Sequence, residues 1–289
     1  MVTFFKNFSG LIKLKSEPLQ YKIVLFLLLF AAITVTTPYS FAEIDSYTTP
    51  KEFKNSIGMK FVLIPSGRSV IGSPDGGGDS RRDETPQHMV SFDKPFYLGK
   101  YEVTQQQYKL VMNRNISKFK LFGETRPVEN VSWYDAQKFI KKLNELEGEN
   151  KYRLPTESEW EYACRAGTKT DYSFGDDEAD IAQYAWYGDN KGNANGRTHD
   201  IGSKKPNPWG LYDMHGNVLE WVQDVYKRTA YRGEEHRGKN HLYEGSGSFR
   251  ILRGGSWIHD AEDLRCANRN FNLPGNIYHN TGFRILKEL

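Results

Sequence analysis

The chain has 289 residues, of which 38% are hydrophobic, so it is long enough to bury a sizeable core. Lysine and arginine together number 39 against 36 acidic residues, which gives a formal net charge of +3. Because nucleic-acid binding needs a concentrated basic face, this near balance argues against that class of protein.

Residues 1–42 have the pattern of a signal peptide. Lysines precede an apolar run from Ile23 to Val35, and Ser40-Phe41-Ala42 has the small residues that signal peptidase accepts. The run is shorter than the about 20 apolar residues of a spanning helix, although an uncleaved anchor is the alternative. We predict cleavage before Glu43 and a periplasmic or secreted protein without membrane contact. Losing four lysines and one glutamate would bring the net charge to zero.

The first part of the mature chain predicts short strands and loops. Residues 43–54 are polar and predict a linker. The apolar run 61–65, ended by proline, predicts a buried strand, and residues 96–98 and 101–103 predict a second strand region. Residues 73–82 are rich in glycine and aspartate and predict a surface loop. They lack the frame of a phosphate-binding loop.

Three helices are predicted by capping boxes, in which a threonine or serine is followed three residues later by a side chain that caps in return. Apolar residues recur at helical spacing behind each box, so their aromatic side chains are expected in the core. Gly148 and Gly167 are expected to end the second and third helices. The pairs are Thr104 with Gln107, Ser132 with Asp135, and Thr156 with Glu159.

Beyond residue 168 the sequence is dominated by glycine, asparagine, aspartate and aromatic residues, without a helical period. This composition predicts short strands joined by long ordered loops, which are usually functional or held by ions.

The only two cysteines, Cys164 and Cys266, are 102 residues apart in sequence. In an oxidising compartment they are expected to form one disulfide, worth on the order of 4–5 kcal/mol by the chain-entropy argument. Two buried free thiols are the alternative.

Seven motifs follow one another in a recognisable order, and in this order they resemble the formylglycine-generating-enzyme (sulfatase-modifying factor) superfamily. The resemblance implies one α+β domain over residues 55–287 with a C-type-lectin-like core that is poor in regular secondary structure. The motifs are 55–59, 101–104, 126–133, 153–163, 209–217, Arg253-Gly254-Gly255-Ser256-Trp257 and Gly282-Phe283-Arg284.

The chemistry of that family depends on residues that this chain lacks. The oxidases of the family are similar to a copper enzyme in which two thiolates hold Cu(I), a soft ion that prefers sulfur. The matching positions here fall on His259 and near Leu264, and Leu219 replaces a tryptophan of the family pattern. Copper is therefore not expected, and no catalytic residue is assigned.

Two other kinds of site remain as alternatives at this stage. An iron or zinc site assembled from His259, His279 and Asp260 stays open, although the histidines lack a metal-binding spacing. A serine hydrolase is less favoured, because the Gly-x-Ser-x-Gly elbow is missing.

The resemblance also implies a structural calcium ion in the loop that contains Gly216-Asn217-Val218-Leu219-Glu220-Trp221. Hard cations take carboxylate and carbonyl oxygens. The implied ligands are the side chains of Asp213 and Glu220 and the carbonyls of Gly216 and Val218. The alternative is that both acidic side chains only cap and hydrogen-bond the loop.

The C-terminal segment resembles the variable region of target proteins of diversity-generating retroelements, which display ligand-binding residues on the same lectin-like fold. Ordinary divergence of a surface loop is the alternative. Aromatic and small polar side chains on a rigid scaffold suit recognition. The expected ligand cleft comprises Ser256, Trp257, His259, Asp260, Phe271, Tyr278 and His279.

These patterns together favour an exported binding or accessory module whose partner is an unidentified protein, peptide or glycan. A divergent oxidase or maturation factor acting on an exported protein or peptide is the main alternative, and a ligand-display protein is the second.

Overall fold

The computed structural model describes residues 51–74, 82–188, 192–233, 238–239 and 242–289. The predicted signal peptide and residues 43–50 of the predicted linker lie outside these ranges. Among the described residues, no helix is both long and apolar enough to cross a membrane.

A five-stranded antiparallel sheet joins the two ends of the described chain. Leu286 of its fourth strand pairs with Leu98 on one side and Arg153 on the other, so β12 is an interior strand of the sheet. The order is β1 (Glu52–Lys54), β2 (Lys60–Ile64), β5 (Phe96–Gly99), β12 (Leu286–Lys287) and β6 (Tyr152–Arg153).

Two smaller sheets complete the β-structure. In the four-stranded sheet, β7 is antiparallel to β9 and parallel to β11. Its order is β10 (Asn270–Asn272), β9 (Arg250–Arg253), β7 (Leu219–Val225) and β11 (Thr281–Gly282). The three-stranded sheet contains β3 (Gly67–Ile71), β4 (His88–Phe92) and β8 (Gly238–Lys239).

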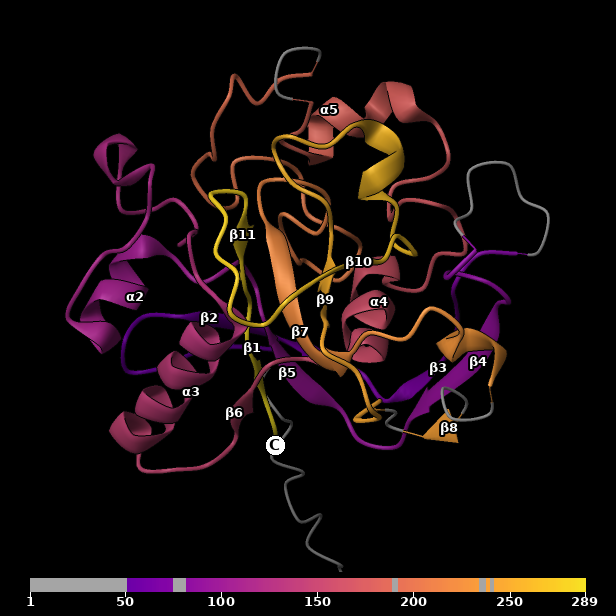
Figure 1. Cartoon of the computed structure of the whole chain (residues 1–289), viewed down its shortest axis with the longest axis horizontal. Coiled ribbons are helices and arrows are strands. Elements are labelled where there is room, and N and C mark those ends of the chain that lie inside the picture. Colours follow the sequence, from indigo (N-terminus) through magenta and orange to yellow (C-terminus); the bar gives the residue numbers. More distant parts are fainter. Residues whose placement is uncertain (1–50, 75–81, 189–191, 234–237, 240–241) are drawn as a thin grey trace, which may run out of the picture. The chain divides into compact units, whose positions relative to one another are not determined.

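The three predicted helices are confirmed, each with its capping box. Figure 1 shows α2 and α3 on one side of β7 and α4 on the other. The helices are α2 (Gln105–Met112), α3 (Trp133–Glu147), α4 (Glu157–Arg165) and the short α5 (Ile181–Tyr184). Single 3-10 turns are η1 (Lys120–Phe122), η2 (Glu178–Asp180), η3 (Ala230–Arg232) and η5 (Ala261–Leu264).

Three local predictions need correction. Residues 101–103 are not a strand, because the chain leaves the sheet there and turns toward the cap of α2. The end of the predicted linker forms β1, which pairs with β2. Helix α4 ends in a left-handed residue at Ala166, one position before the glycine expected to stop it.

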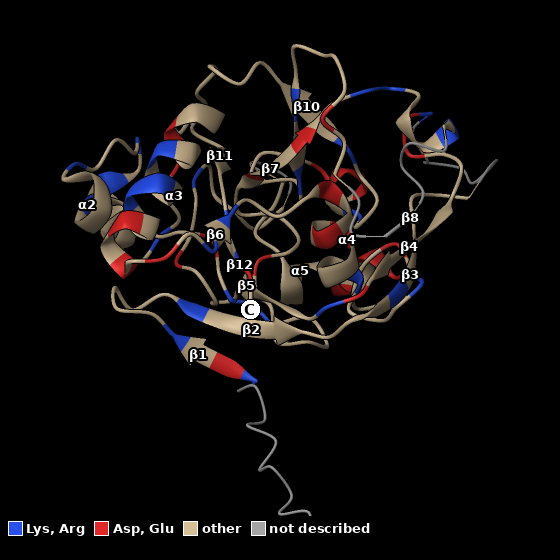
Figure 2. Ribbon diagram, turned by 90° about the horizontal axis from the view of Figure 1, so that it is seen from below, with Lys and Arg blue, Asp and Glu red and all other residues tan. Residues whose placement is uncertain are grey.

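Helix α4 is buried along its whole length although it carries three glutamates. Figure 2 marks them as red segments on α4. Each glutamate meets an arginine: Glu157 pairs with Arg269, Glu159 with Arg153, and Glu161 with both Arg165 and Arg253. Buried charges are tolerated only when they are paired in this way. The three glutamates of α4 therefore stabilise the core through their ion pairs.

Apolar packing holds the rest together in two main clusters. One packs α2 and α3 against β2, β7 and β9 and includes Trp221 and Phe283. The other surrounds α4 and includes Trp160 and Tyr231. The outcome is the expected α+β domain, with mostly short strands linked by long loops.

Candidate functional site

The turn after β9 carries Ser256, the first of the residues predicted to form a ligand cleft. Gly254 and Gly255 have φ values of +91° and +68°, a backbone region that favours glycine. A Cβ on Gly255 would lie only 3.0 Å from the carbonyl oxygen of Asp263. The sequence Gly-Gly therefore allows the tight turn that delivers the serine.

The Ser256 hydroxyl is held between two side chains. Its Oγ lies 2.7 Å from Nδ1 of His259 and 3.2 Å from the amide nitrogen of Asn280. Ser256 is fully buried and His259 is half-buried. The arrangement fixes a hydroxyl and an imidazole side by side, with the ring closer to solvent.

An aromatic group adjoins this pair. The Trp257 indole donates a 3.2 Å hydrogen bond to the carbonyl of His279, and their rings are 5.5 Å apart. Phe119, which precedes η1, contacts both rings, at 5.7 Å from Trp257 and 6.2 Å from His279. Burial and the charge of Lys118 lower the pKa of His279, so the ring is neutral near pH 7. Sequence reasoning missed Phe119, which lies far away in the chain.

The other residues predicted to line the cleft do not all lie beside this aromatic group. Asp260 and Tyr278 are exposed, and the Tyr278 carbonyl accepts a hydrogen bond from Asn130. Phe271 lies on β10, where it stacks on Tyr226 at 3.9 Å. Ser256, Trp257, His259 and His279 are thus brought together, whereas Phe271 packs in a separate aromatic group.

A metal site at His259, His279 and Asp260 is not assembled in the described residues, because these side chains do not form a group with converging ligand atoms. The group that does converge is Cys164, His215 and Cys266. Its two sulfurs form the expected disulfide, with Cα atoms 5.8 Å apart, and are therefore not thiolates.

His215 is a structural neighbour of that disulfide. Its Nδ1–H donates to the Leu264 carbonyl at 2.7 Å, and its Nε2 accepts from the Ser173 backbone at 3.2 Å. Burial lowers the pKa of His215 to about 4, so the ring stays neutral near pH 7.

Around the loop predicted to hold calcium, buried carboxylates outnumber buried basic side chains. Arg284 balances the charge of Glu220 and donates two hydrogen bonds of 2.6 Å to its carboxylate. The same carboxylate accepts a third hydrogen bond, of 2.7 Å, from the Trp160 indole. Asp213 accepts one from the Gly202 backbone at 2.7 Å. Burial raises the pKa of Asp213 to about 6.

Glu102 is the acidic neighbour that sequence reasoning missed. It accepts hydrogen bonds from the Asn217 side chain at 2.8 Å and from the Val218 backbone at 3.1 Å. Burial, followed by the charges of Asp213 and Glu220, raises its pKa well above the usual range. Within the described ranges, neither Glu102 nor Asp213 has an ion-pair partner, although the charge of Arg284 acts to lower the pKa of both carboxyls.

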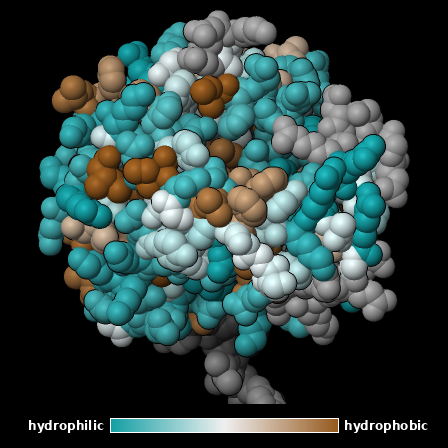
Figure 3. Space-filling model, in the orientation of Figure 1, coloured by the Kyte–Doolittle hydropathy of each residue, from teal (hydrophilic) through white to brown (hydrophobic). Residues whose placement is uncertain are grey.

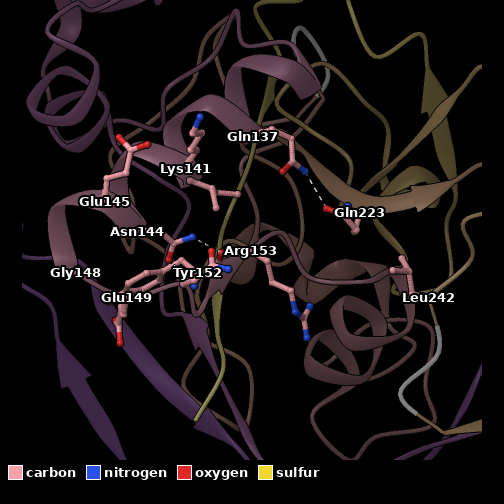
Figure 4. A pocket seen from close by; sticks show the side chains of 12 residues that line it. Gln137, Lys141, Asn144, Glu145, Gly148, Glu149, Tyr152, Arg153, Gln223 and Leu242 are labelled. Atoms are coloured by element: carbon pink, nitrogen blue, oxygen red, sulfur yellow. Dashed lines mark hydrogen bonds between the residues drawn. The ribbon is translucent and has the colours of Figure 1, made fainter.

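A hollow of about 830 Å³ lies beside α3 and β6 (Figure 4). Gln137 of α3 donates a 2.9 Å hydrogen bond to Gln223 of β7 across it. Asn144 bonds to the backbone of Tyr152, again at 2.9 Å. No local pattern in the sequence indicates this hollow, because residues 137–153 form it together with Gln223 and Leu242, which lie far away in the chain.

The fold and the Gly-Gly-Ser-Trp turn define a protein of the formylglycine-generating-enzyme-like class. A family profile described as Sulfatase-modifying factor enzyme 1-like domain matches residues 46–289. The chain therefore belongs to this family.

Individual relatives agree with that assignment. The serine/threonine-protein kinase pkn1 of Chlamydia pneumoniae is 32% identical over 258 residues, which are 80% of this chain and 38% of the kinase. The chain thus spans well under half of that relative. The solved structure of Treponema denticola variable protein 1 has a TM-score of 0.74 and 30% identity, covering 83% of this chain and 100% of that one. PvdO from Pseudomonas aeruginosa has a TM-score of 0.72 and 29% identity, covering 83% and 99%.

Proposed function

We propose that this protein is an exported, non-oxidase member of the family that recognises a protein, peptide or glycan ligand. The recognition surface is formed by His259, Asp260, Tyr278 and His279, which the buried Ser256 and Trp257 support from beneath. The predicted signal peptide supports a periplasmic or secreted location. N-terminal sequencing of the exported protein tests that part, and a mature N-terminus at Glu43 is expected.

The observation that carries the proposal is the fate of the cysteines. The chain has two, and both are used in the buried disulfide between α4 and the C-terminal segment. By the resemblance to the family's oxidases, His259 would take the place of the first copper-binding cysteine, and its Nδ1 lies 2.7 Å from the Ser256 hydroxyl. A Cu(I) ion needs soft ligands, and no thiolate remains to hold it.

Metal and oxygen measurements on the purified mature protein test the proposal. We expect no stoichiometric copper or iron, and no oxygen consumption when a cysteinyl peptide is added under air compared with an anaerobic control. Stoichiometric redox metal with peptide-dependent oxygen uptake would instead favour a divergent oxidase or maturation factor.

A ligand-display role is the second candidate, favoured by the pattern of exposure in the C-terminal segment. Ile258, Ile277 and Tyr278 are between 43% and 56% exposed. The same segment also contains almost completely buried residues, such as Arg269 and Phe283, so exposed and buried positions alternate along it. On the face drawn in Figure 3, hydrophobic residues (brown) stand singly or in small groups among hydrophilic ones. The likeness to a variable protein of Treponema denticola supports this reading.

Sequencing this gene in related isolates tests the display role. Substitutions concentrated at exposed positions between residues 258 and 280, with the buried frame unchanged, are expected. An even spread of substitutions over the whole surface would contradict it.

We also propose that a structural calcium ion binds at the buried acidic loop. The side chain of Asp213 and the carbonyls of Gly216 and Val218 would hold it, with Glu102 close enough to add negative charge. The charge of Glu220 is already balanced by Arg284. Glu220 could therefore offer calcium only the oxygen lone pairs that do not accept hydrogen bonds from Arg284 and Trp160.

A further inference from the structure

Three arginines surround a small hollow on another part of the surface. The hollow has a volume of about 310 Å³ and is lined by Arg82, Arg228, Thr229 and Arg232. All four residues are exposed, and they come from the loop before β4 and from the η3 region. None of them belongs to the proposed ligand surface, so the inference does not depend on the proposed function.

The two segments that carry these arginines are fastened to each other. The buried guanidinium of Arg269 donates to the Asp83 carbonyl at 2.8 Å and to the Lys227 carbonyl at 3.3 Å. The Tyr226 hydroxyl adds a 2.9 Å hydrogen bond to the Asp83 carboxylate. Because Asp83 follows Arg82 and Lys227 precedes Arg228, these bonds hold the backbones of two of the arginines in fixed relative positions.

Three acidic side chains of neighbouring described segments have other partners. Asp83 accepts from Tyr226, Glu84 forms an ion pair with Arg265 at 2.8 Å, and Glu157 pairs with Arg269 at 2.8 Å. Within the described ranges, no carboxylate lies within ion-pair distance of the three guanidiniums that line the hollow. Three like charges therefore face one small space next to the Thr229 hydroxyl, and no carboxylate of the described residues pairs with them.

We propose that this hollow binds a sulfate or phosphate monoester. Guanidinium groups match tetrahedral oxyanions with paired N–H donors, and they do so better than lysine because the donors are fixed in a plane. The volume admits the oxyanion and part of the group that carries it. Fixed backbones reduce the ordering cost of binding.

Titration of the mature protein by NMR, observing arginine Nε–Hε signals, tests the site. The probes are glucose 6-sulfate, glucose 6-phosphate and the two inorganic ions, each at constant ionic strength because screening alone shifts exposed charges. Saturable shifts confined to three arginine signals are expected, with the esters binding at least as tightly as the free ions.

Variants give the decisive comparison. Arg228→Ala combined with Arg232→Ala should weaken ester binding by at least about tenfold, since charge-assisted contacts are lost. Arg68→Ala removes one exposed charge from β3 and is the control, which should retain binding. Melting temperatures of all variants exclude unfolding. Shifts that are linear in concentration and equal to those with chloride, or equal losses in the control, would overturn the proposal.

Discussion

At the scale of single residues, Glu161 joins three segments in the core. Its carboxylate accepts hydrogen bonds from the Gly72 backbone at 2.8 Å and from Arg165 Nε at 2.9 Å, and it also pairs with Arg253. All three charged side chains are almost completely buried. Removing the one anion would leave two guanidiniums short of a partner in the interior.

We therefore predict that Glu161→Gln lowers the free energy of unfolding by about 3–5 kcal/mol, the usual cost of breaking a buried pair. Urea denaturation followed by circular dichroism measures it. Glu124→Gln is the matched control, because Glu124 pairs with Lys109 at 2.7 Å on the exposed surface, where pairs contribute only about 0–1 kcal/mol. Equal losses in the two variants would contradict the role given to burial.

Glu129 predicts a pH dependence of stability. Oε1 accepts from the Phe119 backbone at 2.8 Å, while Oε2 is buried without a partner among the described residues. Burial raises the pKa of Glu129 from 4.5 to about 7. A carboxyl whose pKa is higher in the folded state favours folding below its unfolded pKa and loses that contribution as pH rises through the folded one.

The unfolding free energy should therefore contain a fall between about pH 4.5 and 7 that is absent in Glu129→Gln. The glutamine keeps the oxygen that faces Phe119 and carries no charge, so at pH 8 it should be more stable than the wild type by on the order of 2 kcal/mol. Urea unfolding across this pH range measures the difference. A constant difference between the two proteins at all pH values would refute it.

At the scale of elements, capping boxes predicted the three helices correctly because each box is a local pattern. The Thr104, Ser132 and Thr156 hydroxyls all accept the expected backbone hydrogen bond. β7 was not predicted, since nearly all of its residues are buried and the sequence shows no alternation. The composition of residues 101–103 favours a strand, but their backbone does not join a sheet. The Val103 backbone instead bonds to Phe283 and Val128, two residues that only tertiary packing brings near.

The disulfide links α4 to the segment before β10, and it should contribute strongly to stability. Replacing both Cys164 and Cys266 by alanine should lower the unfolding free energy by about 4–5 kcal/mol, because the closed loop is long. Urea unfolding of oxidised, reduced and variant proteins measures this. Reductant should destabilise the wild type and leave the variant unchanged; no change in either would argue against the bond.

At the scale of the whole molecule, the family motifs located the turn that carries Ser256, and the count of two cysteines in a chain predicted to be exported gave the disulfide. They assigned no role to Phe119, which lies in none of the motifs, or to Glu102, which lies in the motif 101–104 but meets Asn217 and Val218 only through tertiary packing. The sequence also grouped Phe271 with the cleft, whereas strand pairing with β9 directs it to Tyr226. The sequence thus predicts which types of side chain are present more reliably than it predicts which side chains contact one another.

Calcium should stabilise the whole domain if it binds at the acidic loop. We predict a higher melting temperature in calcium than in chelator, with about 2.7 kcal/mol gained at 100 times the dissociation constant. Asp213→Asn keeps an oxygen for Gly202 but loses the charge, so it should abolish most of the gain. Scanning calorimetry measures both. An equal calcium effect in this variant would place the ion elsewhere.

The central claim is that this scaffold recognises a ligand and does not oxidise cysteine, because both of its cysteine sulfurs are confined to a buried disulfide. The most direct measurement is mass spectrometry of a cysteinyl peptide incubated under air with the purified mature protein and Cu(I). The account predicts that the peptide emerges with its thiol intact or merely oxidised to disulfide. Protein-dependent conversion of that cysteine to an aldehyde would contradict it.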